Sequence, residues 1–235
     1  MAASNVLAEK RAKTLRMVQT ALLAAIEVIL TLLYIPVGTI NLNFGLVPIV
    51  IAGIFLSPLS GALIGGVSGI VTMIQVLGGQ SPFYAFLIAN NPFMACVLCV
   101  VKTAAAGYVS GLAYRMVNKF CKYVTVSTLV SAVLCPVLNT GIFALGMLTI
   151  FGNDLMADPV ISTWTSDGLV ALVFVVLIGV NFFVELALNV VVCPILGKAL
   201  RATPFFKNEN VKLHNPDLLV FLHRIPGKIC RKSRN

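Results

Sequence analysis

Three ionisable side chains, Glu27, Lys102 and Glu185, stand within long apolar stretches of the sequence. An ionised group in hydrocarbon costs at least ~2.5 kcal/mol, so each is expected to face the interior of a helix bundle and to pair with another group. Lys102 is the only cation of the three. It could anchor an anionic ligand, or it could form a structural salt bridge with Glu27 or Glu185, and the sequence leaves both possibilities open.

Amide side chains form a second set of candidates. Asn181, Glu185 and Asn189 are spaced four residues apart, which places them on one face of a helix. Asn181 lies nearest the predicted outer side of the membrane and is favoured as a ligand contact, whereas Glu185 and Asn189 are expected to be structural. Asn139 is the one strongly polar residue inside its apolar segment, and we expect it to face a cavity.

Further amides lie near the predicted outer loops and could converge with these residues on one outward-facing pocket. Tyr84 and Trp164 could cover that pocket, or either could be an anchor at the membrane interface. The predicted ligand-binding set is therefore Asn139, Asn181, Lys102, Gln75, Asn90 and Asn91.

Several other chemistries are disfavoured. The Gly66-Val67-Ser68-Gly69 motif resembles that of a serine protease, but the only histidines, His214 and His223, lie far away in the C-terminal tail. The chain has no phosphate-binding GxxxxGK[ST] loop and no acidic cluster suited to a metal. Its Cys-x-x-Cys pair lies in an apolar run, where a buried thiol is unreactive. We predict no catalytic residue, no metal and no cofactor.

Composition indicates an integral membrane protein. The chain is 59% hydrophobic and only 11% charged, with a mean hydropathy of +0.98, and a soluble domain carries about twice that charge. All Lys and Arg residues except Lys102 lie near the two ends or in the 115–122 loop. This is the positive-inside distribution, so the net charge of +9 indicates membrane orientation and not nucleic-acid binding.

The apolar segments predict an all-α bundle of six transmembrane helices with both termini cytoplasmic. The segments run over about 15–35, 44–56, 59–77, 84–117, 124–151 and 168–200. The second is short for a membrane span, and Pro92 is expected to start or kink a helix. The predicted organisation is a basic cytoplasmic leader at 1–14, a membrane domain at 15–202 and a basic cytoplasmic tail at 203–235.

Small residues predict where helices approach closely. Gly61, Gly65 and Gly69 follow a Ser57-Pro58 turn at intervals of four and give their helix a smooth face against another backbone. Ala21 and Ala25 form a second small-residue face in the first segment. That face permits close packing within the bundle, and it would also suit docking on the helices of a partner.

Taken together, these features resemble the substrate-binding S components of energy-coupling factor (ECF) vitamin transporters. The resemblance rests on the six spans, the basic ends, Ala21-x-x-x-Ala25 and three further stretches. These are the 41–71 stretch, Asn90-Asn91-Pro92-Phe93 with Asn139-Thr140, and Asn181-Phe182-Phe183-Val184-Glu185. They cover most of residues 15–200.

The resemblance implies an importer subunit in the cytoplasmic membrane of a prokaryote. It implies a vitamin-binding pocket in which Asn139 and Asn181 hydrogen-bond the ligand. Ala21 and Ala25 would dock on a transmembrane T component, which works with two cytoplasmic ATPases. Pantothenate-type components are the most similar. Riboflavin, folate or another vitamin, a stand-alone transporter and a membrane enzyme are the alternatives, and Val184 stands where a riboflavin-type member would carry Lys.

Overall fold

The computed structural model of the chain describes residues 2–33, 35–37, 40–42, 44–79, 81–121, 123–164 and 167–202. The predicted tail at 203–235 therefore lies outside the described residues. The helical elements are α1 (Ala2–Leu32), α2 (Leu46–Phe55), α3 (Pro58–Leu77), α4 (Pro82–Asn90), α5 (Pro92–Phe120), α6 (Val124–Thr149), α7 (Gly152–Ala157), the 3₁₀ turn η1 (Ile161–Trp164), α8 (Leu169–Ala171), the π-helical η2 (Leu172–Gly179) and α9 (Val180–Ala202). A short antiparallel hairpin joins β1 (Ile35–Val37) and β2 (Ile40–Leu42).

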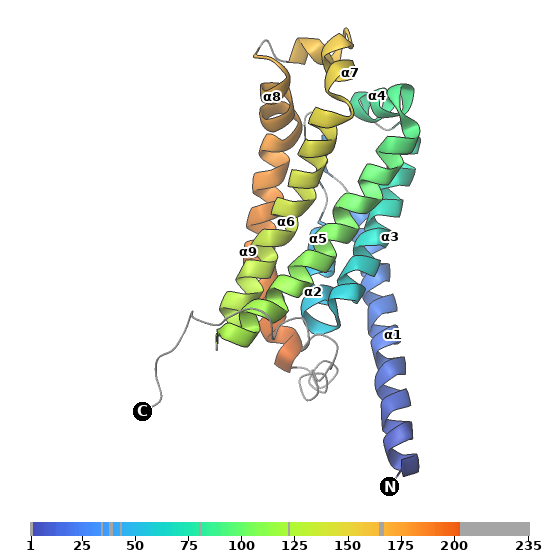
Figure 1. Ribbon diagram of the computed structural model, residues 1–235, viewed down its shortest axis with the longest axis vertical. Coiled ribbons are helices and arrows are strands. Elements are labelled where there is room, and N and C mark those ends of the chain that lie inside the picture. The colour runs from blue at the N-terminus through green and yellow to red at the C-terminus, as the bar shows by residue number, and fades with distance from the viewer. Residues whose placement is uncertain are drawn as a thin grey trace, which may run out of the picture.

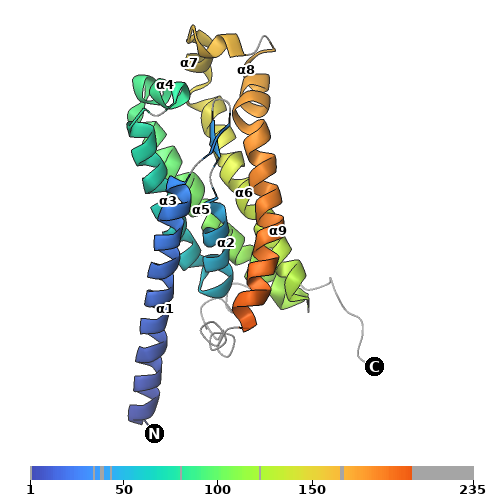
Figure 2. The ribbon, with the colours of Figure 1, turned by 180° about the vertical axis from the view of Figure 1, so that it is seen from behind.

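The long helices run side by side, and the chain reverses at both ends of the bundle (Figure 1). One end carries α4 and α7, and the other carries the start of α1 and the end of α9. The basic leader predicted for residues 1–14 is, from Ala2 onward, the first part of α1. The hairpin occupies the predicted loop at 36–43, and Figure 2 shows it among the helices, where β2 contacts α9.

Three helices begin at a capping side chain followed by proline. Ser57 accepts a 2.9 Å hydrogen bond from the Ser60 amide at the start of α3, and Ser81 and Asn91 cap α4 and α5 in the same way. Proline suits the first helical position because its missing N–H would have no partner there. The prediction that a helix starts at Pro92 is therefore confirmed, and the predicted 84–117 segment is divided into α4 and α5.

Among the residues that the structure describes, five helices are long and apolar enough to cross a membrane: Lys13–Leu32, Pro58–Leu77, Pro92–Phe120, Val124–Thr149 and Asn181–Ala202. The second predicted span is α2, which has only 10 residues. At about 1.5 Å per residue it covers about half of a hydrocarbon core of about 30 Å. The helical membrane bundle is confirmed, but the count of six full spans is not.

The short helix α2 is enclosed by the rest of the bundle. It contacts α1, α3, α5, α6 and α9, and Ile49, Val50 and Ala52 have no exposed surface. Its apolar residues form the centre of one core cluster. A second cluster lies beneath α4 and α7 and includes Phe83, Phe151 and Leu155. The cavity described below is lined by side chains of both clusters.

The glycine face of α3 packs directly on the backbone of α5, as the sequence predicts. A Cβ added at Gly65 would lie 2.8 Å from the Thr103 carbonyl carbon, and one at Gly69 would lie 2.6 Å from Val100 Cα. The partner helix is also smooth at this crossing, since a Cβ on Gly107 would meet the Gly61 backbone at 2.7 Å. The two helices therefore approach as closely as their backbones allow.

Gly65→Ala is expected to destabilise the protein, because its methyl group would push α3 away from α5. Overpacking of this kind costs about 1–3 kcal/mol. The matched control is Gly66→Ala, since a Cβ there meets nothing within 4 Å. Thermal unfolding of the detergent-solubilised protein should show a lower Tm for Gly65→Ala and an unchanged or slightly higher Tm for Gly66→Ala. Equal Tm values for the two variants would contradict the close contact.

Candidate ligand-binding site

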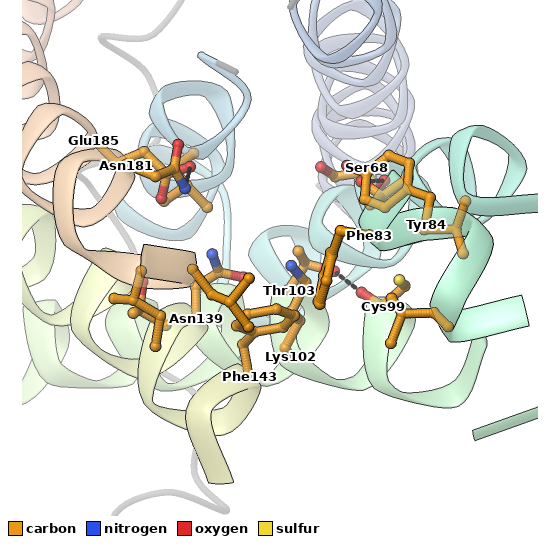
Figure 3. A pocket seen from close by; sticks show the side chains of 17 residues that line it. Ser68, Phe83, Tyr84, Cys99, Lys102, Thr103, Asn139, Phe143, Asn181 and Glu185 are labelled. Carbon is orange, nitrogen blue, oxygen red and sulfur yellow. Dashed lines mark hydrogen bonds between the residues drawn. The ribbon is translucent and has the colours of Figure 1, made fainter. Parts of the chain in front are cut away.

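A cavity of about 80 Å³ lies between α3, α4, α5, α6 and the η2–α9 helix (Figure 3). Its lining combines aromatic and aliphatic side chains with a small number of polar groups, which is the usual composition of a small-molecule site. The residues that line it are Leu46, Ser68, Thr72, Val76, Phe83, Tyr84, Leu87, Cys99, Lys102, Thr103, Asn139, Thr140, Phe143, Leu177, Ile178, Asn181 and Glu185.

The wall formed by α6 and α9 carries amide and carboxylate groups. Asn181 Nδ2 donates a 3.1 Å hydrogen bond to Glu185 Oε1. Three other oxygens of this wall are buried without a hydrogen-bond partner in the described chain: Glu185 Oε2, Asn139 Oδ1 and Asn181 Oδ1. Asn139 and Asn181 thus reach the cavity as predicted, and Glu185, which was expected to be structural, lines the same wall.

Lys102 supplies the cavity with a cation. Its Nζ lies 4.9 Å from the centroid of the Phe143 ring, a cation–π contact. Within the described part of the chain it forms no ion pair with either Glu27 or Glu185, although its charge acts on Glu185 electrostatically. Of the two roles left open by the sequence, the direct salt bridge is thus not seen among the described residues.

Hydroxyl groups and aromatic rings complete the lining. Thr72 Oγ1 donates to the Ser68 carbonyl at 3.0 Å, and Thr103 Oγ1 donates to the Cys99 carbonyl at 3.0 Å. Thr72 and Thr103 were not singled out from the sequence. Each satisfies its own helix backbone, so its sequence position carries no signal of a cavity.

The aromatic side of the cavity comes from α4 and α6. The Phe83 ring meets the Phe143 ring edge-on, with centroids 6.2 Å apart. Tyr84 lines the cavity beside Phe83 (Figure 3), as the sequence allowed. Trp164 packs on the neighbouring apolar cluster and is not among the lining residues.

Three predicted ligand-binding residues lie away from the cavity lining. Gln75 is buried and its Nε2 donates to the Thr31 carbonyl at 3.0 Å, which ties α3 to α1. Asn90 Nδ2 donates to the Phe86 carbonyl at 2.9 Å, and Asn91 caps α5. The structure gives each of these amides a local partner and does not bring it together with Lys102.

Glu27 lies behind the cavity, between α1 and α3. It is fully buried, as expected, and Oε1 accepts a 2.7 Å hydrogen bond from Thr31 Oγ1. Thr31 Oγ1 also lies 3.4 Å from Ser68 Oγ, which lines the cavity. A short polar path therefore runs from the cavity into α1, the helix that carries Ala21 and Ala25 on its exposed surface.

The groups that line the cavity are suited to binding a small molecule. No group of three or more His, Cys, Asp or Glu side chains that could hold a metal occurs in the part of the chain that the structure describes. Ser68 lies beside Thr31 in a buried polar cluster, where it serves packing and hydrogen bonding. What the cavity offers a small molecule is one cation, several acceptors and aromatic faces.

A comparison with protein-family models identifies the family of the chain. The model of the family described as "ECF transporter, substrate-specific component" matches residues 15–197. The chain belongs to this family. As a substrate-specific component it is a multi-pass membrane subunit that binds a vitamin-type substrate for an ECF transporter, and its family role is in transport and not in catalysis. No significant match was found among the curated proteins or the solved structures.

Family membership also implies partners for this substrate-specific component. ECF transporters combine such a subunit with a transmembrane T component and ATPase subunits. The part of the chain matched by the family model contains α1 from Leu15 onward and therefore both Ala21 and Ala25. It also contains every residue that lines the cavity.

Proposed function

We propose that this substrate-specific component captures an anionic vitamin of the pantothenate type. The observation that carries the proposal is the position of Lys102, a partly buried cation that lines the cavity and has no ion pair in the described chain. A ligand carboxylate would form a charge-assisted hydrogen bond with its ammonium group. Asn139 and Asn181 would hydrogen-bond the uncharged part of the same molecule. The positions of Gln75, Asn90 and Asn91 do not support a direct ligand contact for them.

The proposed orientation places the α4 and α7 end of the bundle outside the cell. The five long apolar helices would supply five passages between the two ends, and the hairpin with α2 would supply a sixth. In this orientation the basic residues at the ends of α5 and α9 would lie on the cytoplasmic side, in accord with the positive-inside rule. These residues are Arg115, Lys119, Lys198 and Arg201. The membrane would be the cytoplasmic membrane of a prokaryote.

The proposed transport complex contains this component, a T component and two ATPases. Ala21 and Ala25 would form the docking face, because small side chains allow helix backbones to approach closely in lipid. Both alanines are exposed on the described structure. Co-purification with a T component and two ATPases is the expected result. If the purified component alone moved substrate down an ion gradient, it would be a stand-alone transporter.

The ligand is tested by native mass spectrometry and a thermal-shift panel of vitamins on the purified protein. Pantothenate is expected to give a bound mass and the largest rise in Tm, because binding to the folded state alone stabilises it. A larger shift with folate, riboflavin or another vitamin would replace the proposed substrate. Binding of none of them would contradict the assignment of the cavity.

A further inference from the structure

The cavity wall formed by α6 and α9 presents hydrogen-bond acceptors that nothing in the described chain satisfies. Glu185 Oε2, Asn139 Oδ1 and Asn181 Oδ1 are all buried without a partner. Glu185 is only 4% exposed and Asn139 only 7%. Buried polar atoms are nearly always hydrogen-bonded in folded proteins, so three such oxygens around one cavity indicate that their donors come from elsewhere.

The hydrogen bonds within this wall determine which of its oxygen atoms remain without a donor. The Asn181 side-chain amide donates a 3.1 Å hydrogen bond from Nδ2 to Glu185 Oε1. That bond leaves the Asn181 carbonyl oxygen and the second carboxylate oxygen of Glu185 without a partner in the described chain. Behind them, Asn189 Nδ2 donates to the Glu185 backbone carbonyl at 2.8 Å and holds this turn of α9.

We propose that Glu185, with Asn139 and Asn181, forms an acceptor subsite that selects ligands bearing hydroxyl or N–H groups. This inference rests on the proposed function and deepens it by defining the ligand at both ends. The carboxylate of the ligand lies toward Lys102 on α5, and its donor-bearing end lies against α6 and α9. Figure 3 shows Asn181 and Glu185 on the opposite side of the view from Tyr84, with the Lys102 side chain of α5 lying between the two sides.

The selection follows from the cost of leaving buried acceptors unpaired. A ligand with hydroxyl groups supplies the donors that these acceptors lack in the described chain. A ligand of the same shape without donors leaves them desolvated and unpaired, and each lost bond is expected to weaken binding roughly tenfold. Pantothenate has the required polarity, since it carries a carboxylate at one end and hydroxyl groups with an amide N–H toward the other.

The test compares two probes on two variants by isothermal titration or ligand-induced Tm shift. The probes are pantothenate and a deoxy analogue in which hydrogen replaces both hydroxyl groups. Wild-type protein is expected to bind pantothenate at least roughly tenfold more tightly than the analogue. In Glu185→Gln, an amide N–H donor replaces an acceptor toward the ligand, so the preference should fall toward one. An unchanged preference would overturn the proposal.

Two further variants separate this role from a structural one. Asn139→Leu keeps a similar volume and removes the acceptor, so it should also reduce the preference, and it serves as the second arm if Glu185→Gln does not fold. Ser131→Ala is the matched control, because Ser131 is buried on α6, the helix of Asn139, donates to the Ser110 carbonyl at 2.9 Å and does not line the cavity. It should lower Tm and leave the preference between the probes unchanged.

Failure of the proposed substrate can be distinguished from failure of the subsite. If wild-type protein binds neither probe, the pantothenate proposal fails, and the subsite is judged on the panel vitamin that does raise Tm. That vitamin should carry hydroxyl or N–H donors and should lose affinity in Glu185→Gln. A ligand that binds wild type and Glu185→Gln equally well would contradict the subsite, whichever vitamin it is.

Discussion

Ala21→Trp in α1 is expected to abolish vitamin uptake while leaving vitamin binding intact. Ala21 lies on the exposed surface of α1, and the ligand cavity is lined by residues of other helices and of α2. A bulky ring on a close-packed docking face costs about 1–3 kcal/mol, which corresponds to a loss of about 5-fold to 150-fold in association. Uptake is measured in proteoliposomes containing the whole transporter, and binding on the purified component. Ala25→Trp should behave in the same way.

The matched control is Ile195→Trp on α9. Ile195 is 61% exposed, and α9 lies on the opposite side of the bundle from α1 in both views (Figures 1 and 2). This variant should retain uptake, because a lipid-facing aromatic side chain disturbs no docking surface. Loss of binding in Ala21→Trp, or equal loss of uptake in Ile195→Trp, would remove the alanine face as the point of docking.

The close helix crossing could be predicted from the sequence because its cause is local. Gly61, Gly65 and Gly69 recur at the spacing of one helical face, and only a neighbouring backbone exploits such a face. The neighbouring helix carries a matching pattern, since Gly107 and Gly111 on α5 also lie four residues apart. A Cβ on Gly107 would meet Gly61, and one on Gly111 would meet Pro58 and Gly53. The order in which these residues meet depends on how the two helices cross.

The position of α2 could not be predicted from hydropathy alone. Its residues are as apolar as those of a membrane span, and nothing in the composition of Leu46–Phe55 tells whether lipid or protein surrounds it. The structure encloses it within the bundle, with Ile49 and Val50 fully buried. Length was the informative signal, since a helix of 10 residues is too short to span a bilayer alone.

The candidate site was predictable where a polar group had no local alternative. Lys102 and Asn139 lie in the middle of apolar helices, so their polar groups must turn inward, and both line the cavity. Polar residues near helix ends behave differently. Asn91 caps a helix, and Asn90 bonds the preceding turn. Such residues find backbone partners nearby, so their position beside a predicted pocket was weak evidence for ligand contact.

Lys102→Met is expected to weaken binding of an acidic vitamin far more than binding of its neutral amide. Methionine keeps much of the length of the side chain and removes the charge. A hydrogen bond to a charged group contributes about 1.5–3 kcal/mol, so affinity for pantothenate should fall about 10-fold to 100-fold. Affinity for the uncharged amide of pantothenate should change much less. Both ligands are measured by titration calorimetry on wild-type and variant protein.

The comparison between the two ligands is what separates the roles of Lys102. If the ammonium group served only to balance Glu185, its removal would disturb the shared wall of the cavity and weaken both ligands alike. Lys102→Arg is the matched control, because it retains the cation and should retain the preference for the acid over the amide. If Lys102→Met lowered the affinity for the acid and for the amide by the same factor, Lys102 would have a structural role in the bundle. The ligand carboxylate would then have no identified partner. A selective loss for the acid would place that carboxylate beside α5, and the donor-bearing end of the ligand would then face Glu185.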